Sequence, residues 1–156
     1  MKKLLFVLLI SASCFGQTPF WKLNGLNLEE IYLNIKAQGS IGVSFYRTPD
    51  ENQNNFVLRV ASKPCERTKG VVLLFTDGSV LRFPEIEVFC MQGSENLELT
   101  AAIPMTDALR EKMASGELTS FTLGKTEVPV KYSDKFDKLS DLAQLYKLHL
   151  ENESKR

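Results

Sequence analysis

The strongest constraint on the fold is a hairpin signal in the middle of the chain. Apolar runs at 71–75 and 79–83 flank Asp77-Gly78, and an Asp-Gly pair between two apolar runs is among the strongest short signals for a β-hairpin. A two-residue turn at Asp77-Gly78 predicts that Thr76 lies opposite Ser79. The same register, carried outward along both strands, brings Cys65 opposite Cys90.

The two cysteines of this hairpin are therefore expected to form a disulfide. Facing residues of antiparallel strands have Cα atoms roughly 4.5–5.5 Å apart, which is inside the range that a disulfide accepts. A bulge at Pro64 or Gly70 would shift the register by one residue. Two separate buried thiols are the alternative to a bond between Cys65 and Cys90.

Residues 1–17 have the composition of a secretory signal peptide. Two lysines precede the apolar run 4–10, and a tail of mostly small residues follows it, which is the order typical of such signals. The run is shorter than the roughly 20 residues that cross a bilayer. We expect cleavage after Gly16. The alternatives are a lipid anchor on Cys14, as in an outer-membrane lipoprotein, and a buried N-terminal helix.

The remaining residues fit one domain at 18–150, with a flexible C-terminal tail at 151–156. The whole chain has 19 basic and 19 acidic residues, so its formal net charge is zero. Nucleic-acid-binding proteins usually display basic patches, and no basic cluster is evident in the sequence. No second apolar stretch is long enough to span a membrane. We therefore expect neither a nucleic-acid partner nor a transmembrane segment in the mature chain.

Alternating apolar and polar residues predict strands along most of the domain. The expected strands are at 41–46, 56–60, 71–76, 79–83, 86–91, 97–103, 118–123 and 126–130. Residues 27–36 fit a helix or a strand, and we expect the helix. The predicted fold is α+β, a mainly antiparallel sheet arranged as a sandwich-like meander, with two to three helices including a C-terminal one.

Two helices have clear local signals. Thr106 is expected to cap a helix at 107–115 that buries Leu109 and Met113, with Gly116 after its end. The C-terminal helix is expected to start near Ser133 or Asp134. Its apolar positions are predicted to be Phe136, Leu139, Leu142, Ala143 and Tyr146.

Few residues offer catalytic or metal-binding chemistry. His149 is the one histidine of the chain and lies near the C-terminus, where nothing holds a general base in place. Zinc sites need several Cys or His ligands, and the segment 39–42 lacks the lysine of a phosphate-binding loop. We assign no catalytic, cofactor-binding or metal-binding residue, and we expect no cofactor.

Two groups of carboxylates are candidates for a catalytic or metal site. Glu85 and Glu87 lie two positions apart on one strand, as neighbours on a solvated face rather than as a pair across a cleft. Asp134, Asp137 and Asp141 cluster at the expected start of the last helix, where negative charge is favourable. Both groups are expected to have structural roles.

Three segments, 69–83, 97–106 and 118–123, give the chain a pattern of turns and apolar positions. This pattern resembles that of a group of small, uncharacterised exported proteins of Bacteroidetes, and the end of the signal is also typical of that phylum. The resemblance implies an envelope or secreted location and an α+β fold. It implies no activity and no functional residues.

The sequence therefore favours an exported, non-enzymatic accessory or binding module of the bacterial periplasm or outer membrane. Its partner would be an unknown envelope protein or ligand. The alternatives are a small hydrolase that uses carboxylates and an inhibitor or immunity-type protein. A binding module predicts an exposed apolar patch or an uncovered sheet edge. An enzyme predicts a concave pocket with acidic groups whose pKa values are raised.

Overall fold

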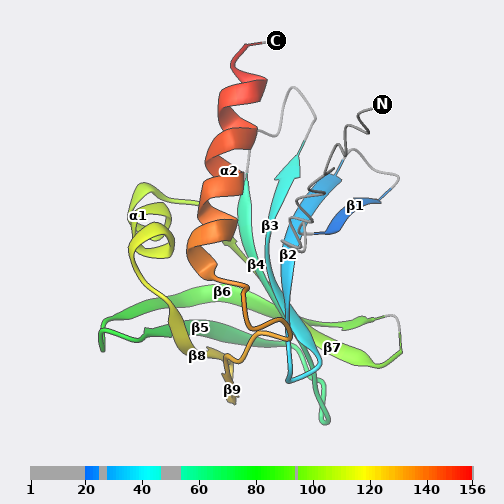
Figure 1. Ribbon diagram of the computed structural model, residues 1–156. Helices are drawn as coiled ribbons and strands as arrows, with labels where there is room; N and C mark the ends of the chain where they lie inside the picture. Colours follow the sequence, from blue (N-terminus) through cyan, green and yellow to red (C-terminus); the bar gives the residue numbers. More distant parts are fainter. Residues whose placement is uncertain (1–19, 25–27, 47–53, 94, 156) are drawn as a thin grey trace, which may run out of the picture.

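The computed structural model describes residues 20–24, 28–46, 54–93 and 95–155 (Figure 1). The expected signal peptide at 1–17, with Cys14, lies outside these residues. The described elements are, in chain order, β1 (Phe20–Asn24), β2 (Leu28–Ile35), β3 (Gly39–Tyr46), β4 (Asn55–Ala61), β5 (Thr68–Phe75), β6 (Val80–Gln92), β7 (Leu97–Pro104), α1 (Asp107–Ser115), β8 (Leu118–Leu123), β9 (Thr126–Pro129) and α2 (Leu139–Glu153).

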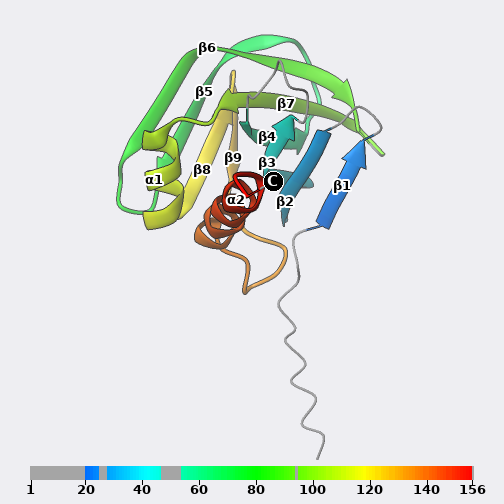
Figure 2. The same cartoon turned by 90° about the horizontal axis from the view of Figure 1, so that it is seen from above.

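The described strands form a single antiparallel sheet in the order β1-β2-β3-β4-β7-β6-β5-β8-β9. The sheet curls into a half-barrel around α2 (Figure 2). It curls so far that Ile35 at the end of β2 bridges Tyr132, just after β9. The amide of Lys36 also donates to the carbonyl of Lys131 at 2.8 Å. The predicted α+β class with a C-terminal helix is confirmed, and the sheet is one curled layer.

The hydrophobic core lies on the concave side of this sheet, beneath the two helices (Figure 2). Large side chains from most strands and from α1 are almost completely buried there, which supplies the main stabilisation of the domain. The largest are Phe45, Phe56, Phe75, Phe121, Ile31, Ile41, Leu58, Leu73, Ile103, Leu109, Met113 and Leu123.

The segment 27–36 was expected to be helical, and that prediction is wrong: Leu28–Ile35 is β2. Its apolar side chains Ile31, Leu33 and Ile35 are each less than 5% exposed and face the core at every second position. This is the period of a strand. Pairing with β3 along the whole segment satisfies its backbone.

The central hairpin forms, but its turn is one residue longer than predicted. The amide of Phe75 donates to the carbonyl of Ser79 at 3.0 Å, so the turn contains Thr76, Asp77 and Gly78. Gly78 has φ +80°, a conformation that glycine adopts at little cost and that closes three-residue hairpin turns. Thr76 therefore does not face Ser79.

A second irregularity lies farther along the hairpin, at Gly70. On the turn side of this residue Val71 pairs with Phe83, whereas on the other side Lys69 pairs with Glu87. One residue of β5 is thus opposite three of β6, so the strands pass through a bulge. The uniform register from the turn to the cysteines was wrong, and the shift occurs at Gly70, one of the two residues at which the sequence allowed a bulge.

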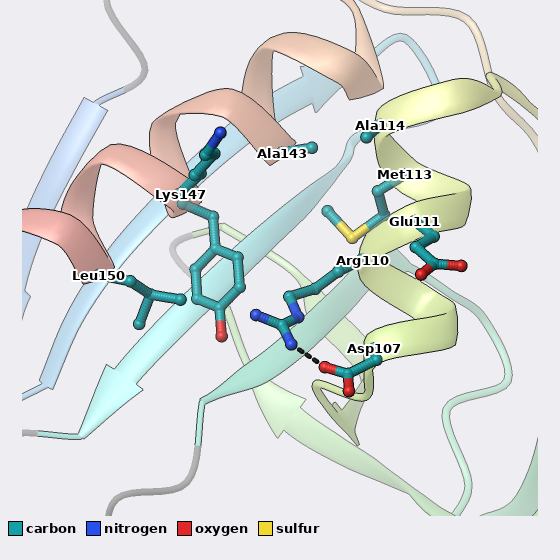
Figure 3. A pocket seen from close by; sticks show the side chains of 9 residues that line it. Asp107, Arg110, Glu111, Met113, Ala114, Ala143, Lys147 and Leu150 are labelled. Atoms are coloured by element: carbon teal, nitrogen blue, oxygen red, sulfur yellow. Dashed lines mark ion pairs between the residues drawn. The ribbon is translucent and has the colours of Figure 1, made fainter.

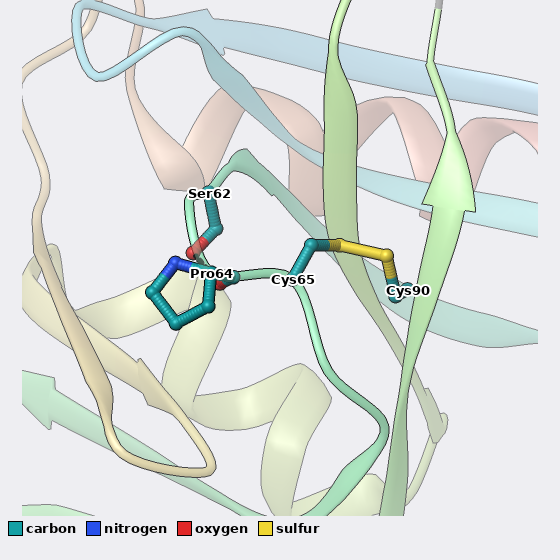
Figure 4. Close-up of a disulfide and its surroundings, with 4 residues drawn as sticks. All are labelled: Ser62, Pro64, Cys65 and Cys90. Atoms are coloured by element: carbon teal, nitrogen blue, oxygen red, sulfur yellow. Dashed lines mark hydrogen bonds between the residues drawn. A yellow bond between two sulfur atoms is a disulfide. The ribbon is translucent and has the colours of Figure 1, made fainter.

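The Cys65–Cys90 disulfide is nevertheless present, with the two Cα atoms 5.3 Å apart (Figure 4). Cys65 lies in the irregular segment before β5, just after Pro64, and reaches across to Cys90 on β6. Cys90 is opposite Leu99 of β7, whose side chain is 3% exposed. The bridge therefore lies against the core side of the sheet.

Helix α1 matches its prediction. The hydroxyl of Thr106 accepts a hydrogen bond from the amide of Leu109 at 3.2 Å, and Leu109 and Met113 are buried. The ammonium of Lys112 donates to Asp77 in the hairpin turn at 2.6 Å. This contact, together with hydrogen bonds from Ser79, holds the pKa of Asp77 well below its ordinary value.

Helix α2 begins at Leu139, several residues later than predicted. Asp134 instead forms a turn in which its side chain accepts from the amide of Phe136 at 2.9 Å. Phe136 is 65% exposed, not part of the core. The helix continues through Glu153, so the first residues of the expected tail at 151–156 are helical.

The start of α2 is stabilised by a side chain from another element. Glu117, just before β8, accepts a hydrogen bond from the amide of Leu139 at 2.9 Å. The hydroxyl of Tyr132 donates to the same carboxylate at 3.3 Å. Burial, with a smaller contribution from the charge of Glu117, raises the pKa of Tyr132 above its ordinary value. Glu117 therefore caps the N-terminus of α2, although it lies 22 positions before Leu139 in the sequence.

Candidate functional site

A groove of about 450 Å³ lies between α1 and α2 (Figure 3). Its apolar lining comes from both helices: Met113 and Ala114 from α1, and Ala143 and Leu150 from α2. The two alanines keep the space between the helices open, because a larger side chain at either position would fill it. The flexible methionine can adapt to ligands of different shape.

Charged side chains of both signs surround this apolar lining. Arg110 extends from α1 toward α2 and forms an ion pair with Asp107 (Figure 3). Glu111 lines the groove from the same helix, and Lys147 lines it from α2. An apolar centre surrounded by polar and charged residues is the usual anatomy of a protein–protein interface. The two carboxylates of the groove, Asp107 and Glu111, come from one helix and do not face each other across the groove.

The carboxylates Glu85 and Glu87 occupy the outer part of the central hairpin. Glu87 forms an ion pair with Arg67, and the carboxylate of Glu85 lies 3.9 Å from the ammonium of Lys69. Arg67 also lies over the ring of Phe89, 5.0 Å from its centroid. These contacts join the two sides of the hairpin on the surface, which is the structural role that the sequence predicted.

His149 packs on the core rather than lining the groove. Its ring centroid is 3.9 Å from that of Phe45, which is almost completely buried on β3. The contact places the last turns of α2 against the sheet. This position gives His149 a packing role, which the sequence did not predict.

The aspartates near α2 form an electrostatic cluster. Burial raises the pKa of Asp137 above its ordinary value, and the charges of Asp134 and Asp141 raise it further. Within the described ranges, no group of three or more His, Cys, Asp or Glu side chains is arranged to hold a metal ion. The raised pKa of Asp137 therefore results from burial first, with repulsion from Asp134 and Asp141 adding to it.

A second hollow, of about 430 Å³, lies on the convex side of the sheet. Its lining is mainly polar and includes Glu30, Arg59 and Glu98, from β2, β4 and β7. Sequence reasoning missed this hollow, because its residues come from distant segments of the chain. No local signal indicates it, because Glu30 is one of two adjacent glutamates in β2 and its burial is evident only in the fold.

Three observations concern the compartment in which the protein folds and its similarity to known proteins. Neither described helix is long and apolar enough to cross a membrane. The Cys65–Cys90 bond is consistent with an oxidising compartment, where disulfides form and persist. Comparisons with protein-family models, with curated proteins and with solved structures find no match to this chain.

Proposed function

We propose that this chain is an exported, non-enzymatic binding module of the bacterial periplasm or outer membrane. Its ligand is a segment of an envelope protein that seats an apolar side chain in the groove between α1 and α2. The observation that carries this proposal is the groove itself, with an apolar floor between two helices and charges of both signs at its rim.

The rim favours a protein segment over a purely apolar ligand. Arg110 and Lys147 offer positive charge on opposite sides of the groove, whereas Asp107 and Glu111 offer negative charge on one side. A polypeptide can present an apolar side chain flanked by charges that complement both signs. Complementary rim charges guide the approach of such a partner and select against wrong ones.

The location part of the proposal rests on two features. The N-terminal residues 1–17 have the order of a signal peptide, and the disulfide supports folding outside the reducing cytoplasm. Attachment to the outer membrane through Cys14 is the alternative to a free mature chain.

Intact-mass measurement of the protein purified from its native host tests this location. We expect a mature chain that starts near Gln17, because cleavage after Gly16 leaves small residues at the positions that signal peptidase reads. A mass that includes acyl chains on Cys14 would instead make the protein a lipoprotein. An uncleaved chain would contradict export by this signal.

The groove is tested by site-specific photo-crosslinking in the native envelope. A photo-reactive residue at Ala114, in the groove, should give one discrete crosslinked protein, and the same residue at the exposed Ala102, on the other side of the sheet, should not. Filling the groove with Ala143→Phe should weaken this capture by about tenfold or more, which corresponds to at least about 1.4 kcal/mol of binding free energy.

Thermal unfolding of the Ala143→Phe variant is the control, because the comparison holds only for a folded chain. Equal crosslinking from Ala102 would show that the captured protein is a nonspecific neighbour. Undiminished capture by the folded Ala143→Phe protein would place the binding surface elsewhere.

A further inference from the structure

The polar hollow on the convex side of the sheet has a floor made by a partly buried ion pair. Glu30 on β2 is 4% exposed and accepts hydrogen bonds from both terminal nitrogens of Arg59 on β4, one of them at 2.8 Å. Both partners alternate with core-facing residues of their strands, so they project from the sheet face opposite the helices. The guanidinium and carboxylate therefore meet above β3, the strand between them.

Gly42 on β3 makes room for this pair. It lies between Tyr32 of β2 and Val57 of β4 in the sheet register. A Cβ atom at this position would be 3.1 Å from the carboxylate oxygen of Glu30 and 2.7 Å from the carbonyl oxygen of Ile31. Any other residue at position 42 would first clash with β2, at the carbonyl of Ile31 and the Cβ of Tyr32, and would also crowd the carboxylate of Glu30.

The ion pair is not what a sheet needs for stability alone. A salt bridge with a buried partner rarely stabilises a fold more than apolar side chains of similar size, and the carboxylate of Glu30 is buried here. Residues that break local rules in this way concentrate at functional sites. The ion pair and Gly42 together point to a use for the hollow that they form.

The other polar groups around the floor indicate what kind of ligand fits. Asn34, Asn96 and Ser40 line the walls with groups that can donate and accept hydrogen bonds. Arg59 retains N–H donors beyond the two that bind Glu30, because a guanidinium has five. Glu95 and Glu98 also line the hollow, and their negative charge disfavours an anionic ligand.

We propose that this hollow binds a neutral saccharide. Each hydroxyl of a sugar both donates and accepts a hydrogen bond, so it can match amides, carboxylates and a guanidinium without carrying charge. A volume of about 430 Å³ is within the range of small-molecule sites. The hollow is on the sheet face opposite the helices, so this proposal does not depend on the groove between α1 and α2.

The test is calorimetric titration of the full mature chain with neutral oligosaccharides at millimolar concentration. The probes are gluco-, manno-, xylo- and chito-oligosaccharides. We expect at least one class to bind, and the double variant Asn34→Ala with Asn96→Ala to weaken that binding tenfold or more. The matched control Asn152→Ala, at the exposed end of α2, should bind like the unaltered chain, and so should Ala143→Phe.

The proposal would be overturned by no binding of any of the four oligosaccharide classes or by an unchanged affinity in the double variant. If the double variant does not fold, Glu98→Gln replaces it, because this change keeps the size of the side chain and removes its charge. Unchanged saccharide affinity in folded Glu98→Gln would then count against the site. Loss of binding in Ala143→Phe would assign the saccharide to the groove instead.

Discussion

Replacing Leu109 by alanine is expected to lower the free energy of unfolding by about 2–5 kcal/mol, the usual cost of removing a fully buried leucine side chain. Leu109 is 0% exposed and belongs to the core cluster that α1 shares with the sheet. The loss combines the transfer free energy of the removed atoms with the cavity that remains. Urea denaturation, followed by far-UV circular dichroism, measures the change.

Glu111→Ala on the same helix is the matched control. Glu111 is exposed, so its replacement should change the unfolding free energy by no more than about 0.5 kcal/mol. Equal stability of the Leu109→Ala and Glu111→Ala variants would mean that α1 is not packed on the sheet. In that case the groove between the helices would not have a fixed shape either.

Helix α1 could be predicted because all its signals are local. Thr106 is the cap, Leu109 and Met113 are one turn apart, and Gly116 follows the last turn. Each of these residues acts on a neighbour within four positions of the sequence. The pattern therefore specifies the helix without any knowledge of the rest of the fold.

The strand β2 could not be predicted in the same way, because its sequence satisfies two periods. Ile31 and Ile35 fit one face of a helix, and Ile31, Leu33 and Ile35 fit one face of a strand. Pairing with β3, and the ion pair from Glu30 to Arg59 on β4, are available to the strand in this fold. These contacts are long-range, so tertiary structure decides between a helix and a strand whose apolar patterns fit the sequence about equally well.

The start of α2 shows the same limit. The aspartates at 134 and 137 are good residues for a helix start, yet the helix starts at Leu139 because Glu117 accepts its first free amide. A cap that comes from another strand leaves no signal within the helix sequence. Both hollows are also assembled from distant elements, which is why the sequence indicated binding as a function without locating a surface for it.

The disulfide was predicted correctly from a register that is partly wrong. The turn at Gly78 shifts the pairing in one direction, and the bulge at Gly70 shifts it in the other. The two shifts nearly cancel, and the irregular segment around Cys65 absorbs the remaining difference. The apolar pattern thus specified which strands pair, whereas glycine-dependent backbone details set the register.

Removing this bond is expected to lower the free energy of unfolding by about 3–4 kcal/mol, because the closed loop restricts the unfolded chain. The cysteines are 25 positions apart, and the loop between them contains most of the central hairpin. The double variant Cys65→Ser with Cys90→Ser should show this loss in urea denaturation. A reductant should destabilise the unaltered chain by a similar amount and leave the double variant unchanged. This comparison separates loss of the bond from other effects of the reductant.

Alkylation of the unreduced protein under denaturant provides an independent check of the bond between Cys65 and Cys90. Two labelled thiols, or no effect of the reductant on the unaltered chain, would show that Cys65 and Cys90 are not joined in the native protein.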